Sequence, residues 1–94
     1  MFGASGAVAG VVLESHLLQV CDNHKVTIRK KNPGINDLVT LLKSNSIVEM
    51  SDFKKIQYLA DLRNLCDHKK KTDPTSEQID ELIQGVYRIT KTLS

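Results

Sequence analysis

Four segments of the chain carry apolar residues at spacings of three and four, which places these residues on one face of an α-helix. The first segment runs from about residue 4 to residue 24. Its broad apolar face consists of Val8, Val11, Val12, Leu13, Leu17, Leu18, Val20 and Cys21. Polar residues such as Glu14 and Gln19 complete the other side. The pattern predicts an amphipathic helix whose apolar face is buried.

Two more helices are predicted in the middle of the chain. Asn36 is expected to cap a short helix that ends near Asn45 and turns Leu38, Leu41 and Leu42 inward. Ser51 is expected to cap the next helix, with Asp52 in its first turn. The apolar face of that helix consists of Phe53, Ile56, Leu59, Ala60 and Cys66.

The last helix has the clearest start signal. Asp73-Pro74 breaks the chain, and Thr75-Ser76-Glu77-Gln78 has the sequence of a capping box. Helical spacing then continues to the end through Ile79, Leu82, Ile83, Val86, Ile89 and Leu93. Residues 25 to 34, KVTIRKKNPG, alternate briefly but have no partner strand, so we interpret them as a basic connector. The expected fold is all-α, a small bundle of about four antiparallel helices.

Composition agrees with a single domain that spans residues 1–94. Aromatic residues make up 4% of the chain and Trp is absent, so the core is expected to be aliphatic. A chain of 94 residues buries a modest fraction of its surface, and self-association would stabilise it. Gly3, Gly6, Ala7 and Gly10 follow one another at small spacings. They indicate either close approach of another helix or a frayed first turn.

Charge and cysteine usage indicate a cytoplasmic protein. The net charge is +2, and seven of the thirteen basic residues fall in two segments: Lys25, Arg29, Lys30, Lys31, and Lys69, Lys70, Lys71. Cys21 and Cys66 lie among apolar neighbours, as buried reduced thiols do. The uncharged first thirteen residues are too short to span a bilayer and lack the basic start of a signal peptide. We therefore expect no contact with a membrane.

The end of the third predicted helix is the strongest candidate for function. At about 100° per residue, Arg63 and Asp67 fall inside the apolar stripe, one turn apart. Asn64 and His68 lie together beside it. A buried guanidinium needs a partner or an interface, and Asp67 could supply an ion pair. In a purely structural interpretation, this pair and a helix C-terminus capped by Asn64 and His68 explain the pattern.

The same side chains also suit chemistry on a phosphate. Arg63 offers a planar fork to phosphate oxygens. His68 can accept and donate protons near neutral pH. Asn64 can orient a ring or a phosphate, and Lys69, Lys70 and Lys71 would attract a polyanion such as RNA.

Arg63-Asn64-Leu65-Cys66-Asp67-His68 resembles the R-N-x-x-x-H motif of HEPN domains. The helix before the motif, the short polar loop after it and the final amphipathic helix also resemble that family, over residues 7 to 93. The resemblance implies a helical bundle that dimerises and brings two motifs together in a cleft. Many family members are metal-independent ribonucleases of toxin–antitoxin or antiviral defence systems. Because the chain is short for the family, it would be a minimal version or a fragment.

The resemblance also assigns roles to the residues of the motif. His68 would act as general acid or base while a ribose 2′-hydroxyl attacks the neighbouring phosphate. Arg63 would stabilise the charged transition state, and Asn64 would hold the geometry. The implied partners are RNA, a second copy of the chain and an antitoxin or regulatory protein. No cofactor and no metal are expected.

Three alternatives compete with a nuclease. The first is a non-catalytic dimerisation, adaptor or nucleotide-binding module with the same fold, in which an Arg63–Asp67 pair closes the motif to solvent. The second is a zinc site made of Cys21, His24, Cys66 and His68, which is disfavoured because Cys66 and His68 would point apart on a helix. The third, DNA binding by a helix-turn-helix, fits poorly because the last loop is too long. The remaining histidine, His16, is expected to carry no chemistry.

Overall fold

The computed structural model describes residues 2–67 and 74–94, with side chains for residues 6–65 and 74–94. Four helices make up most of the described chain: α1 (Phe2–Asn23), α2 (Ile35–Ser44), α3 (Met50–Asp67) and α4 (Ser76–Thr92). The described residues include no strand, and the basic connector forms none. The predicted all-α class, a small bundle of four helices, is therefore confirmed.

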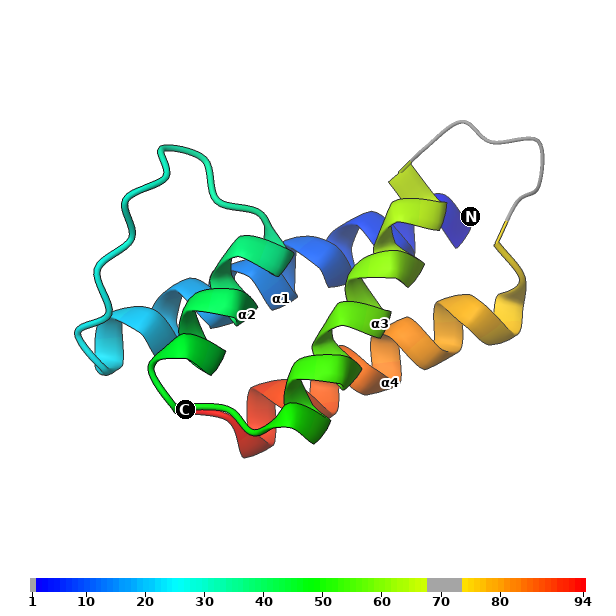
Figure 1. Cartoon of the computed structure of the whole chain (residues 1–94). Helices are drawn as coiled ribbons and strands as arrows, with labels where there is room; N and C mark the ends of the chain where they lie inside the picture. The colour runs from blue at the N-terminus through cyan, green and yellow to red at the C-terminus, as the bar shows by residue number, and fades with distance from the viewer. Residues whose placement is uncertain (1, 68–73) are drawn as a thin grey trace.

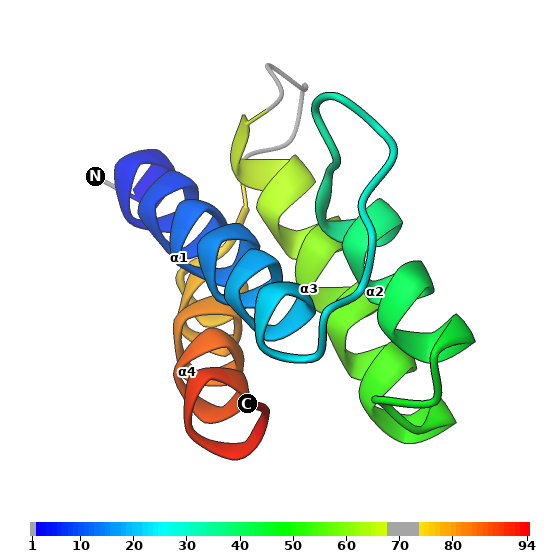
Figure 2. The same cartoon turned by 90° about the vertical axis from the view of Figure 1, so that its left-hand side faces the viewer.

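The helices are arranged around a central pair. Within the described chain, α1 and α3 each contact all the other helices, whereas α2 and α4 contact only α1 and α3. Figures 1 and 2 show that α3 runs in the opposite direction to α1, α2 and α4, so the expected antiparallel arrangement holds only for the helix pairs that include α3. Because α1 and α2 run the same way, the connector between them loops back along the outside of the bundle (Figure 1). This path brings the basic connector to the N-terminal end of α2.

Hydrogen bonds at the helix starts confirm one predicted cap and correct two. At α4 the Thr75 hydroxyl accepts from the Gln78 N–H and the Gln78 side chain accepts from the Thr75 N–H, which is the predicted capping box. Asn36 was wrongly expected to cap α2. Gly34 holds that position instead, and the Asp37 carboxylate accepts the Gly34 N–H at 2.9 Å. The stronger acceptor three residues on explains this earlier start.

The start of α3 also differs from the prediction. The helix begins at Met50, so Ser51 lies inside its first turn rather than at its cap. The Phe53 N–H donates to the Glu49 carbonyl at 2.9 Å, which begins the helical hydrogen bonding two residues earlier than a cap at Ser51 would allow. The apolar face still begins at Phe53, because a shift in the start of a helix leaves its periodicity unchanged.

The ends of α1 and α2 share a geometry that the sequence does not signal. Lys25 (φ 58°) and Ser46 (φ 59°) adopt the left-handed conformation that glycine usually supplies at this position. The next residues, Val26 and Ile47, donate their N–H groups to carbonyls five residues earlier, at 2.8 and 2.9 Å. Both side chains also pack against the core. These apolar contacts hold the chain in a conformation that non-glycine residues seldom adopt.

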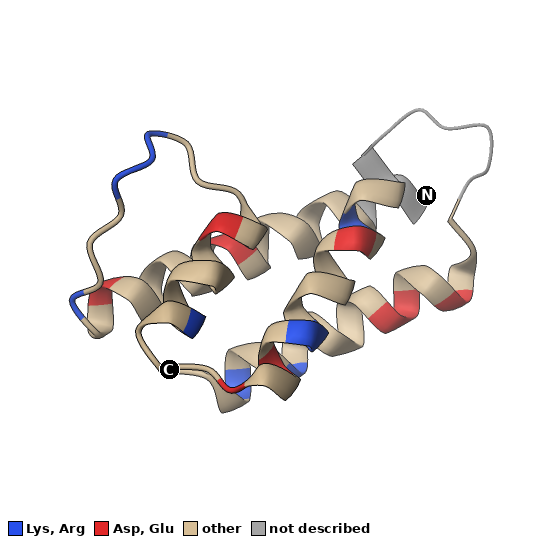
Figure 3. Cartoon of the chain, in the orientation of Figure 1, with Lys and Arg blue, Asp and Glu red and all other residues tan. Residues whose placement is uncertain are grey.

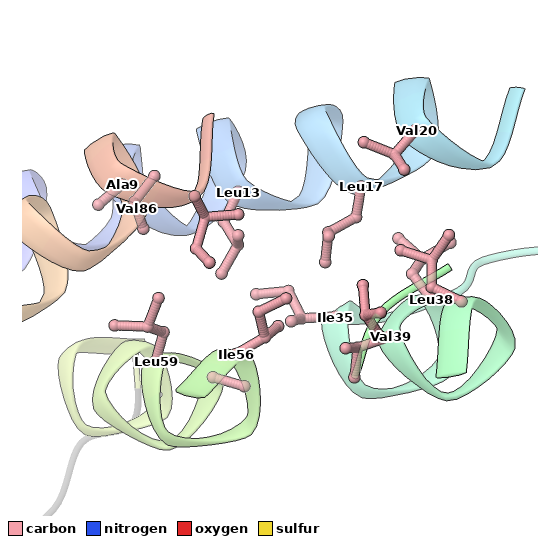
Figure 4. Close-up of a cluster of buried hydrophobic side chains, with 14 of the residues drawn as sticks. Ala9, Leu13, Leu17, Val20, Ile35, Leu38, Val39, Ile56, Leu59 and Val86 are labelled. Carbon is pink, nitrogen blue, oxygen red and sulfur yellow. The ribbon is translucent and has the colours of Figure 1, made fainter. Parts of the chain in front are cut away.

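The core is aliphatic, as the composition predicts (Figure 4). Most of its members come from α1, α2 and α3, and Val86 and Leu82 extend it onto α4. The largest fully buried side chains are Leu13, Leu17, Leu38, Leu42, Ile56, Leu82, Val20, Val39 and Cys21. Ile35, Val39 and Leu62 are buried although the predicted apolar faces did not include them.

Five residues that were expected in the core are exposed instead: Val8, Val11, Val12, Leu18 and Ile83. The first half of α1 is apolar around most of its circumference, but neighbouring helices cover only the side of Leu13 and Leu17. The spacing of apolar residues identifies an apolar surface but does not show how much of that surface another helix covers. For this reason the burial of these five residues was wrongly predicted. Among the described helices, α1 included, none has an apolar run of the length that a bilayer crossing requires.

Candidate functional site

Arg63 lies on the inward side of α3, as predicted, and is half-buried. Its aliphatic stem packs against Gly10 of α1, where an added Cβ would overlap the Arg63 Cγ and lie 2.7 Å from its Nε. The Nε atom is itself buried. At Gly10, therefore, the small residues of α1 do allow a close approach from another helix, and the group that fills the space is the arginine side chain.

Arg63 and Asn64 line a depression between α3 and the start of α2. Its volume is about 230 Å³, and its remaining lining residues are Gly34, Ile35, Asn36, Asp37 and Ala60. The first hydrogen bond within α2 runs from the Leu38 N–H to the Gly34 carbonyl, at 3.1 Å. The N–H groups of the preceding turn thus point out of the helix end, where anions bind in many proteins. The depression combines a guanidinium, an amide side chain and a helix N-terminus.

Asp37 places a negative charge at the same depression, and two contacts stabilise it. Its Oδ2 accepts the Gly34 N–H at 2.9 Å and the Lys30 ammonium at 3.0 Å. The Gly34 hydrogen bond and then the Lys30 hydrogen bond hold the pKa of Asp37 below its ordinary value. Because Lys30 pairs with this carboxylate, the basic connector contributes a cation close to the depression.

Asn64 also borders a second depression, on the side of α3 that faces α4. This depression has a volume of about 390 Å³ and is lined by Tyr58, Asp61, Leu62, Asn64, Leu65 and Gln78. The Tyr58 hydroxyl donates to Glu81 of α4 at 3.0 Å, and this hydrogen bond raises the pKa of Tyr58. Asn64 therefore lies between two hollows and can reach a ligand from either.

Several predicted site residues lie outside the described part of the chain. His68, Lys69, Lys70 and Lys71 are among residues 68–73, and the side chains of Cys66 and Asp67 are also outside it. The Arg63–Asp67 ion pair and the pairing of Asn64 with His68 stay predictions. Of the proposed catalytic residues, the structure brings Arg63 and Asn64 together at one depression.

Two histidines, His16 in α1 and His24 just after it, contact the last two residues of the chain. The His16 Nε2–H donates to the Leu93 carbonyl, and the His24 Nε2–H donates to the Ser94 carbonyl at 2.8 Å. Cys21 is fully buried, and desolvation raises the pKa of its thiol. Within the described residues, no three His, Cys, Asp or Glu side chains gather as they would around a metal ion.

Sequence reasoning missed the contribution of α2 to this site. Helix spacing showed Arg63 and Asn64, but the meeting of α3 with the start of α2 depends on the path of the connector. Pro33-Gly34 before an apolar run was the available signal, because it marks a helix start at which backbone N–H groups are exposed. Comparisons with protein-family models, with curated proteins and with solved structures gave no match to this chain.

Proposed function

We propose that the chain is a HEPN-like RNA-binding domain that cleaves RNA without a metal ion, in the cytoplasm, as part of a toxin or defence system. The observation that supports the proposal best is the depression that Arg63 and Asn64 share with the N-terminal end of α2. A guanidinium and outward N–H groups suit a phosphate, and RNA presents one at every nucleotide. An antitoxin or another regulatory protein is the proposed partner.

In this proposal the phosphate next to the scissile bond binds at the depression. The ribose 2′-oxygen forms a bond to that phosphorus while the bond from phosphorus to the 5′-oxygen of the next nucleotide breaks. His68 takes the 2′-hydroxyl proton or protonates the leaving 5′-oxygen, and water exchanges the other proton. Arg63 stabilises the negative charge that builds up on the phosphate oxygens. A fixed charge of this kind can contribute about 3–4 kcal/mol, or a factor of about 10²–10³ in rate. Asn64 orients the phosphate, and Lys69, Lys70 and Lys71 attract the RNA strand.

The proposal is tested by RNA cleavage in EDTA. We expect wild type to cleave, His68→Ala and Asn64→Ala to lose at least tenfold in rate, and Arg63→Met to lose about 10²–10³. Methionine keeps much of the stem that packs on Gly10 while it removes the charge. Lys54→Ala is the matched control, because Lys54 is exposed on α3 away from the depression.

Circular dichroism melting must show each variant folded. An inert wild-type protein, or a His68→Ala variant as active as wild type, would contradict catalysis. RNA binding is measured separately, as the change in affinity with salt for wild type and Arg63→Met. Loss of cleavage with binding retained separates the catalytic role of His68 from the binding role of Arg63.

One observation favours a second candidate, a non-catalytic adaptor or nucleotide-binding module. The Arg63 stem fills the space above Gly10, and its Nε is buried, so the residue also joins α3 to α1. In a purely structural role, the packing of Arg63 matters more than its charge. Arg63→Met would then leave every RNA measurement unchanged, whereas Arg63→Ala would lower the melting temperature.

A further inference from the structure

An exposed apolar groove runs between α1 and α4. Its walls are Val8 and Val12 of α1 and Ile83 and Tyr87 of α4, and its volume is about 500 Å³. Ala9, Val86 and Thr90 complete its lining. Val8 is 63% exposed and Tyr87 is 57% exposed. Val11 of α1 is also exposed, so the apolar surface continues along this helix. Monomeric proteins seldom leave such a surface contiguous and open to water.

Charged residues of opposite sign flank the apolar positions of α4. Asp80 comes three residues before Ile83, and Lys91 comes four residues after Tyr87, so all four lie on one face of the helix. Both charged residues are exposed. The Lys91 ammonium lies 4.3 Å from the centre of the Tyr87 ring, at the edge of the groove. Along this face of α4 an acidic residue is therefore followed by two apolar residues and then by a basic residue.

This order of charges is complementary to the same order read in the opposite direction. Figure 3 shows acidic residues near the start of α4 and basic residues near its end. If a second α4 lies antiparallel on the first, the acidic half of each meets the basic half of the other. Asp80 and Lys91 are almost equally far from the centre between Ile83 and Tyr87, so both charge pairs form in the same register. Such self-complementarity defines a two-fold interface between identical chains.

We propose that a second copy of this chain docks on the groove, with the two α4 helices antiparallel across a two-fold axis. Ile83 then packs on the partner's Tyr87, and Asp80 faces the partner's Lys91. Val8 and Val12 supply the apolar wall that each incoming Tyr87 contacts. The same charge order also suits the dipole of α4 itself, and the apolar centre between the charges turns it into an interface.

The groove is on a different side of the molecule from the candidate phosphate site. Val8 and Val12 are each two residues from Gly10, so each points about 160° away from it around the helix. Gly10 is the residue that contacts Arg63. A dimer formed through the groove keeps the two Arg63 residues apart, unlike the shared cleft that the HEPN resemblance implies. The inference is therefore independent of the proposed function.

Sedimentation equilibrium across a range of concentrations tests the proposal. We expect wild type to dimerise, and Ile83→Glu to weaken dimerisation at least tenfold while the fold is kept, because Ile83 is 40% exposed. Lys54→Glu, on the exposed surface of α3, is the control and should dimerise as wild type does.

A charge-swap experiment tests the register. Asp80→Lys and Lys91→Asp should each weaken self-association, because each homodimer would contain two like-charged contacts. Mixed together, the two variants should form a heterodimer, since both contacts then join opposite charges. Both positions are exposed, so both variants should melt near the wild-type temperature.

Three results would overturn the proposal: a wild-type chain that stays monomeric, a dimer insensitive to Ile83→Glu, or charge variants that associate no better mixed than alone. RNA cleavage by Ile83→Glu, measured in parallel, reports on the phosphate site alone. Failure of one proposal can thus be told from failure of the other.

Discussion

The contact between Gly10 and Arg63 puts two demands on one residue. The arginine stem needs the space that glycine leaves on α1, while its head borders a depression suited to an anion. An arginine on the inward side of a helix keeps its long stem in an apolar setting and its charge near the surface. The position of Arg63 is therefore fixed by packing, whatever ligand the depression takes.

Gly10→Ala tests this contact. In an open helix position, alanine stabilises by about 1 kcal/mol relative to glycine. Here the new methyl group would overlap the Arg63 stem, so we expect the free energy of unfolding to fall by about 1–3 kcal/mol. In an Arg63→Ala background the overlap is gone, and the same change should stabilise. Urea unfolding of the four proteins measures the reversal, and an equal effect of Gly10→Ala in both backgrounds would contradict the contact.

At the scale of the helix, Asp37 links the start of α2 to the basic connector. Its carboxylate accepts hydrogen bonds from the Gly34 N–H and the Lys30 ammonium. Its negative charge also interacts favourably with the positive end of the α2 dipole. The cap therefore depends on an ionised side chain, in contrast to the neutral Thr75–Gln78 box of α4.

The stability of α2 should accordingly depend on acid. The pKa of Asp37 is lowered in the folded chain, first by the Gly34 hydrogen bond and then by Lys30. The ordinary pKa of Asp37 is 3.8, and because the pKa is lower in the folded chain, the ionised carboxylate stabilises the fold at pH values above 3.8. This contribution is lost as the pH falls below 3.8 and through the pKa of the folded chain. Asp37→Asn should remove this part of the acid dependence, so the melting temperatures of the variant and of wild type should become equal at low pH. Melting temperatures of both proteins, measured between about pH 2 and pH 6, check this prediction. If the two melting temperatures fall in parallel with pH, Asp37 does not contribute to the acid dependence.

At the scale of the whole molecule, the helices, their order and the all-α class were predictable, because helical spacing of apolar residues reports local structure. The orientation of α1 was not. Between residues 6 and 13 no side chain is polar, so the half of the surface that contains Val8 and Val11 resembles the half that contains Leu13, but only the second half is buried by neighbouring helices. Which half is covered depends on tertiary packing, and so does the meeting of Arg63 with the start of α2.

Substitutions of two consecutive leucines test the orientation of α1. Leu17 is fully buried, whereas Leu18 is 38% exposed. Leu17→Ala should lower the free energy of unfolding by about 2–5 kcal/mol, because it leaves a cavity between helices. Leu18→Ala should lower it by about 1 kcal/mol or less. Chemical denaturation at one protein concentration compares the two variants, and similar losses would mean that α1 is rotated relative to the arrangement in Figure 4.

The length and position of α2 affect how readily this part of the fold opens locally. With ten residues it is shorter than helices that hold together alone in water, and within the described chain it contacts only α1 and α3. The shortest of the four described helices has the fewest backbone hydrogen bonds to break, so α2 should open locally at a lower free-energy cost than the others, and its amide hydrogens should exchange with solvent early. Since the start of α2 also forms one wall of the candidate site, an anion bound there would slow that exchange. The most easily opened helix would then be the one that a ligand closes.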